Sequence, residues 1–323
     1  MGMSLEDIKG QERAVQYLRS ALKNRRLPHA FLFVGPTGSG RRILAKTFAK
    51  AVNCLDRDDG PCGKCNSCRK IDEDIHPDVT WIAKDEKSNQ VKIQSIRELE
   101  GGIALKPYEG RYKVYVVLDG ECMNLEASNS FLKTLEEPPD HSIIIIIANS
   151  AHAMLPTVRS RCQVVRLKPL SRAALKTILT DEHHIPPEKA DFISRYAEGK
   201  LGKALSEKDA ITDNKNRYLD EFLKGEEGDI YTKEDRSELS SKLNILASWY
   251  RDLLIYKTTN DAELLINVDR MDMIKKESNR HSANRLICML ESVIKTKDML
   301  EANVNPKLAI SAMHNTMSSD KPC

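Results

Sequence analysis

A glycine-rich loop near the amino end of the chain holds the first residues whose types and spacing could do chemistry. The segment Gly35-Pro-Thr-Gly38-Ser-Gly40 follows the apolar run Phe31 to Val34 and precedes residues with helical periodicity. Glycines let backbone N–H groups converge on an anion, and the positive end of a helix dipole favours negative charge at the same place. The loop therefore predicts a phosphate cradle between a strand and a helix.

The next two positions depart from what phosphate hydrolysis requires. A working cradle continues with a lysine, which reaches the β and γ phosphates, and with a serine or threonine, whose hydroxyl holds Mg²⁺. This chain has Arg41 and Arg42 instead. Arginine can pair with phosphate, but its planar fork differs in shape from an ammonium group, and it cannot ligate Mg²⁺. We therefore expect neither hydrolysis at this loop nor binding of ATP with Mg²⁺ by this chain.

The acidic pair that would complete such a site is also broken. It belongs at the end of a later strand, where one carboxylate ligates Mg²⁺ and the next activates water. The apolar run Val114 to Leu118 is followed by Asp119, Gly120 and Glu121. If Asp119 is the metal ligand, the position of the base is Gly120; in the other register the ligand position is Leu118. Capping of a turn is an equally good interpretation of Asp119.

Four of the eight cysteines are concentrated in the spacing Cys54-x7-Cys62-x2-Cys65-x2-Cys68. Two overlapping CxxC steps place three thiolates on a tight knuckle, and Cys54 can complete a tetrahedron around Zn²⁺. Four protein ligands leave no position for water, so the spacing predicts a structural zinc site. An iron–sulfur cluster or disulfides are the alternatives, although a reducing cytoplasm disfavours disulfides.

Short apolar strands alternate with amphipathic helices up to about residue 170, which predicts an α/β domain with a parallel sheet covered on both faces. Two of the strands lack the alternation of a half-exposed strand, as expected of central strands that are buried on both sides. The predicted strands are Phe31 to Val34, Val79 to Ile82, Val114 to Leu118, Ile143 to Ile147 and Val164 to Leu167.

Helical signals replace the strand signals after Pro169. Apolar residues recur every three or four positions from Leu239 to Leu253 and again from Leu286 to Val293, which predicts a helical bundle. The polar residues 207 to 234 are expected to form a connection. We therefore predict an α/β domain over residues 1–170, with the cysteine module at 54–68, and helical domains over residues 171–208 and 209–323.

Composition and charge exclude several classes of protein. The 323 residues are 41% apolar and 30% charged, which is typical of a folded globular protein and not of a disordered one. The longest apolar run, Ile143 to Ala148, is too short to span a membrane, so we expect no membrane partner and a cytoplasmic location. A net charge of +3 does not predict nucleic-acid binding by the whole surface, although Lys23 to Arg26 could contact phosphate.

The order of these features resembles a known family. The motifs that carry the resemblance span residues 4 to 170 and are similar to those of bacterial DNA polymerase III clamp-loader subunits of the AAA+ superfamily. Besides the glycine loop and the cysteines, they are Ile8-Lys-Gly-Gln11, Leu27-Pro-His-Ala-Phe-Leu-Phe33, His76-Pro-Asp78, NSFLKTLEEPP at 129–139 and LPTVRSRC at 155–162.

Within that family the chain is more similar to the delta-prime branch than to the ATPase branch, gamma/tau. Gamma/tau subunits keep GKT and DExx, which Arg41, Arg42 and the broken acidic pair replace here. The length of 323 residues, the run Trp249 to Lys257 and the segment Asn303 to Leu308 are also similar to delta-prime. The alternative is a motor subunit of the gamma/tau type with an atypical phosphate loop.

The resemblance implies a RecA-like AAA+ domain, a small helical lid and a helical collar that joins a hetero-pentameric ring. It also implies a subunit that does not hydrolyse ATP itself and acts with gamma/tau, delta, the sliding clamp and primer-template DNA. Its implied contribution is an arginine finger, Arg161 of Ser160-Arg161-Cys162, which enters the ATP site of the neighbouring subunit. Asn149 and Lys203 occupy the positions of the two sensors and are expected to be remnants of them.

Overall fold

The structure is a computed structural model that describes residues 4–85, 88–224, 236–302 and 304–318. Contacts within the chain divide it into two compact units. The first comprises Met1–Ala174 and Gly199–Gly202, and the second comprises Leu175–Glu198 and Lys203–Cys323. No helix of the described residues is both long and apolar enough to cross a membrane.

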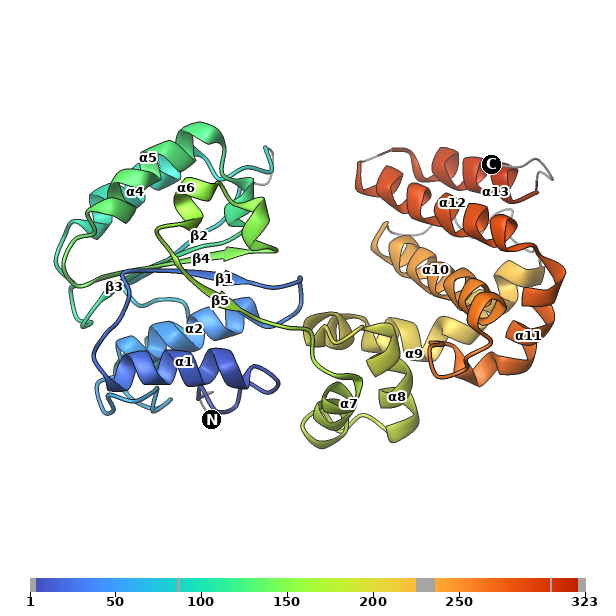
Figure 1. Ribbon diagram of the computed structural model, residues 1–323, viewed down its shortest axis with the longest axis horizontal. Helices are drawn as coiled ribbons and strands as arrows, with labels where there is room; N and C mark the ends of the chain where they lie inside the picture. The colour runs from blue at the N-terminus through green and yellow to red at the C-terminus, as the bar shows by residue number, and fades with distance from the viewer. Residues whose placement is uncertain (1–3, 86–87, 225–235, 303, 319–323) are drawn as a thin grey trace. The chain divides into compact units, whose positions relative to one another are not determined.

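The first unit is built on a parallel five-stranded sheet, as the sequence predicts (Figure 1). Its strand order is β2-β3-β4-β1-β5, so the first strand of the chain lies between the central strand β4 and the edge strand β5. The strands are β1 (Ala30–Val34), β2 (Val79–Ile82), β3 (Lys113–Val117), β4 (Ser142–Ala148) and β5 (Gln163–Arg166).

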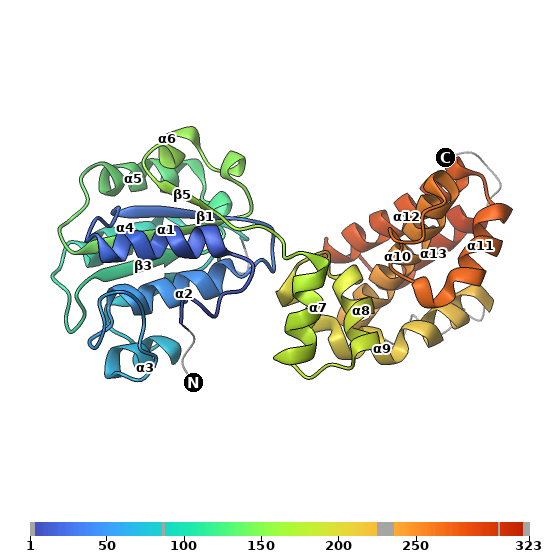
Figure 2. The same cartoon turned by 60° about the horizontal axis from the view of Figure 1, so that its bottom comes forward.

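Helices cover both faces of this sheet (Figures 1 and 2). One face carries α1 (Glu12–Lys23), α2 (Arg41–Val52) and α3 (Asn66–Asp72), and the other carries α4 (Ile93–Ile103), α5 (Leu125–Glu136) and α6 (Pro156–Arg159). Successive residues of β4 feed two separate cores: Ile143 and Ile145 join the core under α1 and α2, while Ile144 and Ile146 join the core under α4 and α5. This double burial explains the uninterrupted apolar run and confirms the predicted RecA-like α/β class.

The second unit is helical, as predicted. Its core includes Leu239, Leu243, Leu246 and Trp249 on one helix and Leu286 on another, all nearly inaccessible to solvent. Its helices are α8 (Pro187–Tyr196), α9 (Leu201–Lys224), α10 (Arg236–Thr259), α11 (Met271–Arg280), α12 (Ala283–Glu301) and α13 (Pro306–Ser318), with most of α7 (Arg172–Asp181) and the short 3₁₀ helix η4 (Val268–Arg270).

One expectation about this region is wrong. Residues 207–224 were expected to form a polar connection, but they continue α9 without a break. A polar segment is compatible with a helix because polar side chains can occupy its solvent-facing side while apolar residues such as Tyr218 and Leu219 face the core. The predicted boundary near residue 208 therefore falls inside a helix, and residues 225–235 lie outside the described residues.

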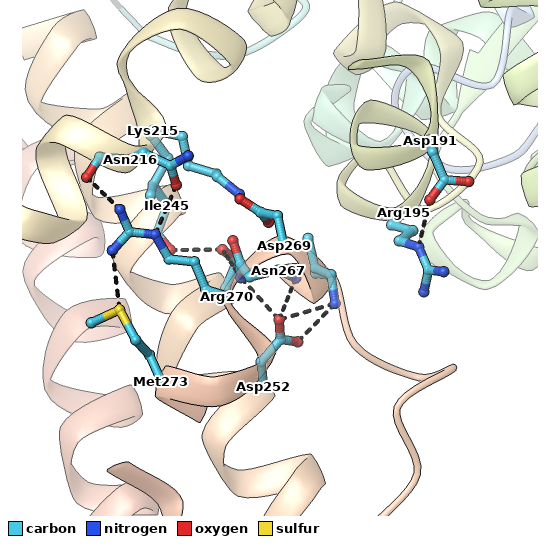
Figure 3. Close-up of polar contacts among 12 residues, drawn as sticks. Asp191, Arg195, Lys215, Asn216, Ile245, Asp252, Asn267, Asp269, Arg270 and Met273 are labelled. Atoms are coloured by element: carbon cyan, nitrogen blue, oxygen red, sulfur yellow. Dashed lines mark hydrogen bonds and ion pairs between the residues drawn. The ribbon is translucent and has the colours of Figure 1, made fainter. Parts of the chain in front are cut away.

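Buried charges hold the second unit together (Figure 3). Asp252 is fully buried and accepts hydrogen bonds from the backbone N–H groups of Ile266 and Asn267. Lys215 is also buried; its Nζ lies 2.6 Å from Oδ1 of Asp269 and 4.1 Å from the ring centroid of Phe192. These contacts fix the segment between α10 and α11 against α9 and α8.

A second set of contacts ties α8 to the same segment. Arg195 donates from Nη1 to the backbone oxygens of Glu263 and Leu265, at 3.0 and 2.8 Å, while its Nε pairs with Asp191 in the same helix (Figure 3). Leu175–Glu198 of the predicted lid therefore share one compact unit with the predicted collar, whereas Gly199–Gly202 belong to the first unit.

Candidate functional site

The glycine loop forms a sharp turn between β1 and α2. Gly38 and Gly40 have backbone φ angles of +82° and +88°, which residues with a side chain rarely adopt, and Gly40 is the residue before the helix. A Cβ atom on Gly35 would lie 2.7 Å from the backbone oxygen of Leu167. The predicted glycines are thus required by the geometry, and the loop leads directly into the amino end of a twelve-residue helix.

Arg41 is held inside the chain instead of projecting freely from the loop. It is 9% exposed, and its Nη2 donates to Oδ1 of Asn149 at 2.9 Å. Both the backbone N–H and the side-chain amide of Asn149 donate to Oε1 of Glu121. Burial lowers the pKa of Arg41, against the opposing effect of Glu121 and Asp119. The structure thus joins Arg41, which takes the place of the lysine, to the predicted sensor Asn149 and to Glu121 in one network of hydrogen bonds.

Neither Arg42 nor Gly120 offers an oxygen side-chain ligand for Mg²⁺, and the structure shows what surrounds each of them. The Arg42 guanidinium stacks over the ring of Trp81, with its Cζ 5.3 Å from the ring centroid. Gly120 is buried, and a Cβ atom there would lie only 2.4 Å from Cγ2 of Ile146. A carboxylate at position 120 would therefore collide with the core. The close approach of Ile146 thus explains why position 120 holds a glycine and not the second carboxylate of the acidic pair.

Residues that follow the first unit's last strand also contact the loop. The backbone N–H of Gly202 donates to the carbonyl oxygen of Gly38 at 3.2 Å, and a Cβ on Gly202 would approach Cα of Gly38 to 3.2 Å. The next residue, Lys203, belongs to the second unit, where its Nζ lies over the ring of Tyr196 at 4.0 Å and donates to the Tyr196 carbonyl.

Arg161 and the glycine loop lie at opposite ends of two neighbouring strands. β1 and β5 run parallel, with Phe31 beside Gln163 and Val34 beside Arg166. The loop leaves the carboxyl end of β1 after Val34, whereas Arg161 precedes the amino end of β5. The rise from Phe31 to Val34 is three residues at about 3.3 Å each, so the two ends of the paired strands are about 10 Å apart. The glycine loop and the turn at Arg161 lie beyond these ends.

The guanidinium of Arg161 has several partners within the chain. Its Nη2 lies 2.5 Å from Oε1 of Glu136, and its Nη1 donates to the Thr157 carbonyl at 3.0 Å and to Ser160 Oγ at 3.4 Å. The side chain is 35% exposed. Cys162 is buried, which raises the pKa of its thiol to about 12, so this residue anchors the turn and is not a thiolate.

The four predicted metal ligands come together. The Sγ atoms of Cys54, Cys62, Cys65 and Cys68 all lie within 4.8 Å of one another. Tetrahedral zinc with Zn–S bonds of ~2.3 Å needs sulfur atoms about 3.8 Å apart, so the cluster fits that ion with small adjustments.

Backbone groups around the cluster suit thiolates. The N–H groups of Cys62, Cys65 and Cys68 each point at the sulfur of an earlier cysteine, at 3.2 to 3.4 Å. Burial raises the pKa of Cys62 and Cys68, whereas at Cys65 the N–H groups of Cys68 and Leu55 outweigh burial and lower the pKa to about 7. The convergence of four sulfur atoms therefore carries the fit to the predicted zinc site, and a bound cation would favour the thiolate form that binds metal.

Comparison with known families decides the relationship of this chain. The family model described as DNA polymerase III, delta subunit, matches residues 10–171, and the model for the C-terminal part of that subunit matches residues 230–314. The chain belongs to the DNA polymerase III delta-subunit family. The family resemblance inferred from the sequence motifs is thereby confirmed.

Relatives of this family member include two kinds of subunit. The chain is 26% identical to DNA polymerase III subunit delta' of Bacillus subtilis, over 91% of this chain and 92% of that protein. It is 28% identical to subunit tau of the same organism, over 94% of this chain but only 59% of the tau subunit. Among solved structures, a gamma-subunit-related protein of Thermotoga maritima is 18% identical with a TM-score of 0.44, covering 94% of this chain and 99% of that one.

The structure gives a role to a motif that sequence reasoning used only for the resemblance. Asp78 of the segment His76-Pro-Asp78 is buried and accepts hydrogen bonds from the backbone N–H groups of Tyr108, Glu109 and Gly110 at 2.7 to 2.9 Å. Burial alone would raise the pKa of Asp78, but these three hydrogen bonds outweigh it and hold the pKa below its usual value. The carboxylate thus fixes the loop between α4 and β3.

His76 connects this carboxylate to the cysteine module. Its Nδ1 accepts the N–H of Asp78 at 3.1 Å, so its proton sits on Nε2, which faces Ser67 Oγ at 3.1 Å. Ser67 lies in α3 beside Cys68. The sequence shows only that a histidine and an aspartate flank Pro77. Their partners are nine residues away for His76, at Ser67, and thirty residues away for Asp78, at Tyr108.

Proposed function

We propose that this chain is the delta-prime-type subunit of a bacterial clamp loader, which supplies Arg161 to the ATP site of a neighbouring subunit and does not turn over ATP itself. The observation that carries the proposal is the position of Arg161. It precedes the amino end of β5, whereas its own glycine loop follows the carboxyl end of the neighbouring strand β1, so a phosphate in that loop is out of its reach. A nucleotide on an adjacent chain is the substrate that a finger at this end of the sheet can serve.

The chemistry of the finger follows from its charge. A guanidinium offers N–H donors in a rigid fork that matches the oxygens of a γ-phosphoryl group. Introduced from outside, it stabilises the charge that develops on those oxygens during hydrolysis, which is worth on the order of 10³ to 10⁵ in rate. Because the finger comes from a second chain, turnover at that site depends on assembly of the ring.

The lack of turnover in this chain is supported by three substitutions. Arg41 takes the lysine position and is engaged by Asn149, Arg42 removes the hydroxyl that would hold Mg²⁺, and Gly120 removes a carboxylate. We assign Asn149 and Lys203 as remnants of the two sensors. A motor subunit of the gamma/tau type, which the relatives named tau would suggest, is the less consistent alternative because all three changes would have to be compensated.

The partners are inferred from the relatives. Proteins named as tau, gamma and delta' subunits of DNA polymerase III match this chain, which supports a shared assembly with gamma/tau and delta subunits. The sliding clamp and primer-template DNA would be handled through that pentameric complex. We propose that zinc held by Cys54, Cys62, Cys65 and Cys68 stabilises the first unit.

An add-back experiment tests the proposal. ATP turnover stimulated by primed DNA is measured in three samples. The first contains the gamma/tau and delta subunits of the same organism, the second contains these subunits together with this chain, and the third contains this chain alone. We expect the chain alone to show no turnover and its addition to raise turnover and clamp loading together. Turnover by the isolated chain, or no effect of its addition to a mixture that assembles, would contradict the proposal.

A further inference from the structure

We propose that Glu136 is the positioning residue of the arginine finger: it holds the guanidinium of Arg161 in the orientation that a neighbouring nucleotide needs. The inference rests on the proposed function of Arg161. It starts from the short contact between Glu136 Oε1 and Arg161 Nη2, at 2.5 Å, between residues that are 25 positions apart in the sequence.

The guanidinium is held from two sides. Glu136 takes Nη2, while Nη1 donates to the carbonyl of Thr157 at 3.0 Å and to Ser160 Oγ at 3.4 Å. Contacts at both terminal nitrogens fix the rotation of the guanidinium plane, which a single contact would leave free. Since a guanidinium has five donors, at least two remain for oxygens outside the chain. The 35% exposure of the Arg161 side chain makes such an approach possible.

Both anchors sit on well-packed elements. Glu136 is the last residue of α5. The residue before it, Leu135, is 1% exposed, and its backbone oxygen accepts a hydrogen bond from Nε2 of His29 at 3.0 Å. Arg161 itself stands between the buried residues Val158 and Cys162. The carboxylate and the base of the finger are therefore fixed relative to each other by the core of the first unit.

The physical gain is orientation. An arginine side chain has several rotatable bonds, and an unrestrained one would rarely present its fork correctly at the moment of hydrolysis. Misplacement of a catalytic group by about 1 Å can cost about 10²-fold in rate. Glu136 itself is half exposed and pairs with Nη2, so it restrains the orientation of a guanidinium that stays charged throughout.

The test compares Glu136→Ala and Glu136→Gln in the reconstituted complex, with Glu137→Ala as the matched control on the next, exposed residue. We expect Glu136→Ala to slow hydrolysis about tenfold at the site that faces this chain, so the DNA-stimulated kcat of the complex falls by most of the share that Arg161→Ala removes, without a change in KM for ATP. Glu136→Gln keeps the accepting oxygen and is expected to lose less than half of what Glu136→Ala loses. A parent-like or higher kcat for Glu136→Ala, or an equal loss in the glutamine variant, would overturn the inference.

A double variant separates positioning from general damage. If Glu136 acts only through Arg161, Glu136→Ala should have no further effect in a chain that already carries Arg161→Ala. An additional loss in that background would assign Glu136 a structural role and overturn the inference. The proposed function fails by a different result, namely parent-like turnover with Arg161→Ala alone. Assembly of every complex is checked by size-exclusion chromatography and native mass spectrometry.

Discussion

Arg161 and Gly35 lie at opposite ends of the neighbouring parallel strands β5 and β1. Gly35 follows β1 at its carboxyl end, whereas Arg161 precedes β5, whose first residue pairs with Phe31 near the amino end of β1. The parallel pairing of β1 and β5 therefore keeps Arg161 and the glycine loop of this chain apart. If Arg161 acts as proposed, this topology requires that its ATP site lie on a neighbouring chain.

The first prediction concerns the glycine loop. Because Arg41 is engaged by Asn149 and no hydroxyl is present at position 42, we expect no Mg²⁺-dependent binding of a fluorescent ATP analogue to the zinc-loaded chain at high micromolar concentration. Fluorescence anisotropy measures this directly, with a gamma/tau subunit as the positive control. Tight binding that disappears with EDTA would restore the motor interpretation and make Arg41 the next residue to replace.

The second prediction concerns the cysteine cluster. Cys62→Ser should release about one zinc ion per chain and lower the stability of the first unit, because metal binding to such a site contributes folding free energy. Metal analysis and thermal unfolding measure the two effects. Cys122→Ser, which replaces a partly exposed thiol outside the cluster, should change neither. A parent protein that holds no zinc and is as stable as the variant would refute the site.

The third prediction concerns Asp78 and pH. Its three N–H partners hold the folded-state pKa below the ordinary value of 3.8, so its contribution to stability is present above pH 3.8 and is lost as the pH falls through the folded-state pKa. Asp78→Asn should cost about 2 to 3 kcal/mol at pH 7.

Urea unfolding of the parent and of Asp78→Asn at neutral and acidic pH measures this effect. The difference between the two proteins should shrink below pH 3.8, because the parent carboxylate then becomes protonated in the unfolded state and, at lower pH, in the folded state. Asp59→Asn, at an exposed position, is the control. A difference that stays constant from pH 7 to the acid limit would contradict the assignment.

The fourth prediction concerns the buried carboxylate of the helical unit. Asp252→Ala leaves the backbone N–H groups of Ile266 and Asn267 without their acceptor and should destabilise the second unit by about 1 to 3 kcal/mol for each unpaired N–H group. Asp298→Ala, at an exposed position of α12, should stay within about 0.5 kcal/mol of the parent. Chemical denaturation followed by circular dichroism distinguishes the two, and equal stability of both variants would count against the network in Figure 3.

Local patterns predicted the sheet well. The run from Ile143 to Ile147 is buried on both faces, as its lack of alternation indicated, and the spacing of the four cysteines predicted a cluster that the structure assembles. Both signals are local, because the apolar run covers five residues and the four cysteines lie within one short segment. The polar stretch 207–224 shows where such reasoning fails, because tertiary packing of one face sustained a helix whose composition suggested a loop.

Contacts between distant segments could not be predicted in this way. Arg41 meets Asn149 across 108 positions, and Arg161 meets Glu136 only because α5 ends beside the turn that precedes β5. The glycine at position 120 was visible in the sequence, but its reason, the close approach of Ile146, depends on the packing of β4. Such pairings are set by the three-dimensional arrangement and leave no periodic trace in one sequence.

The most direct test of the account is the rate of ATP hydrolysis in assembled complexes that differ only at Arg161. With Arg161→Ala, the site that faces this chain should slow by on the order of 10³, so DNA-stimulated kcat falls by the share of turnover that this site carries. Arg161→Lys should recover little, because a point charge does not replace the planar fork. Parent-like kcat in a complex shown to contain the Arg161→Ala chain would contradict the central claim.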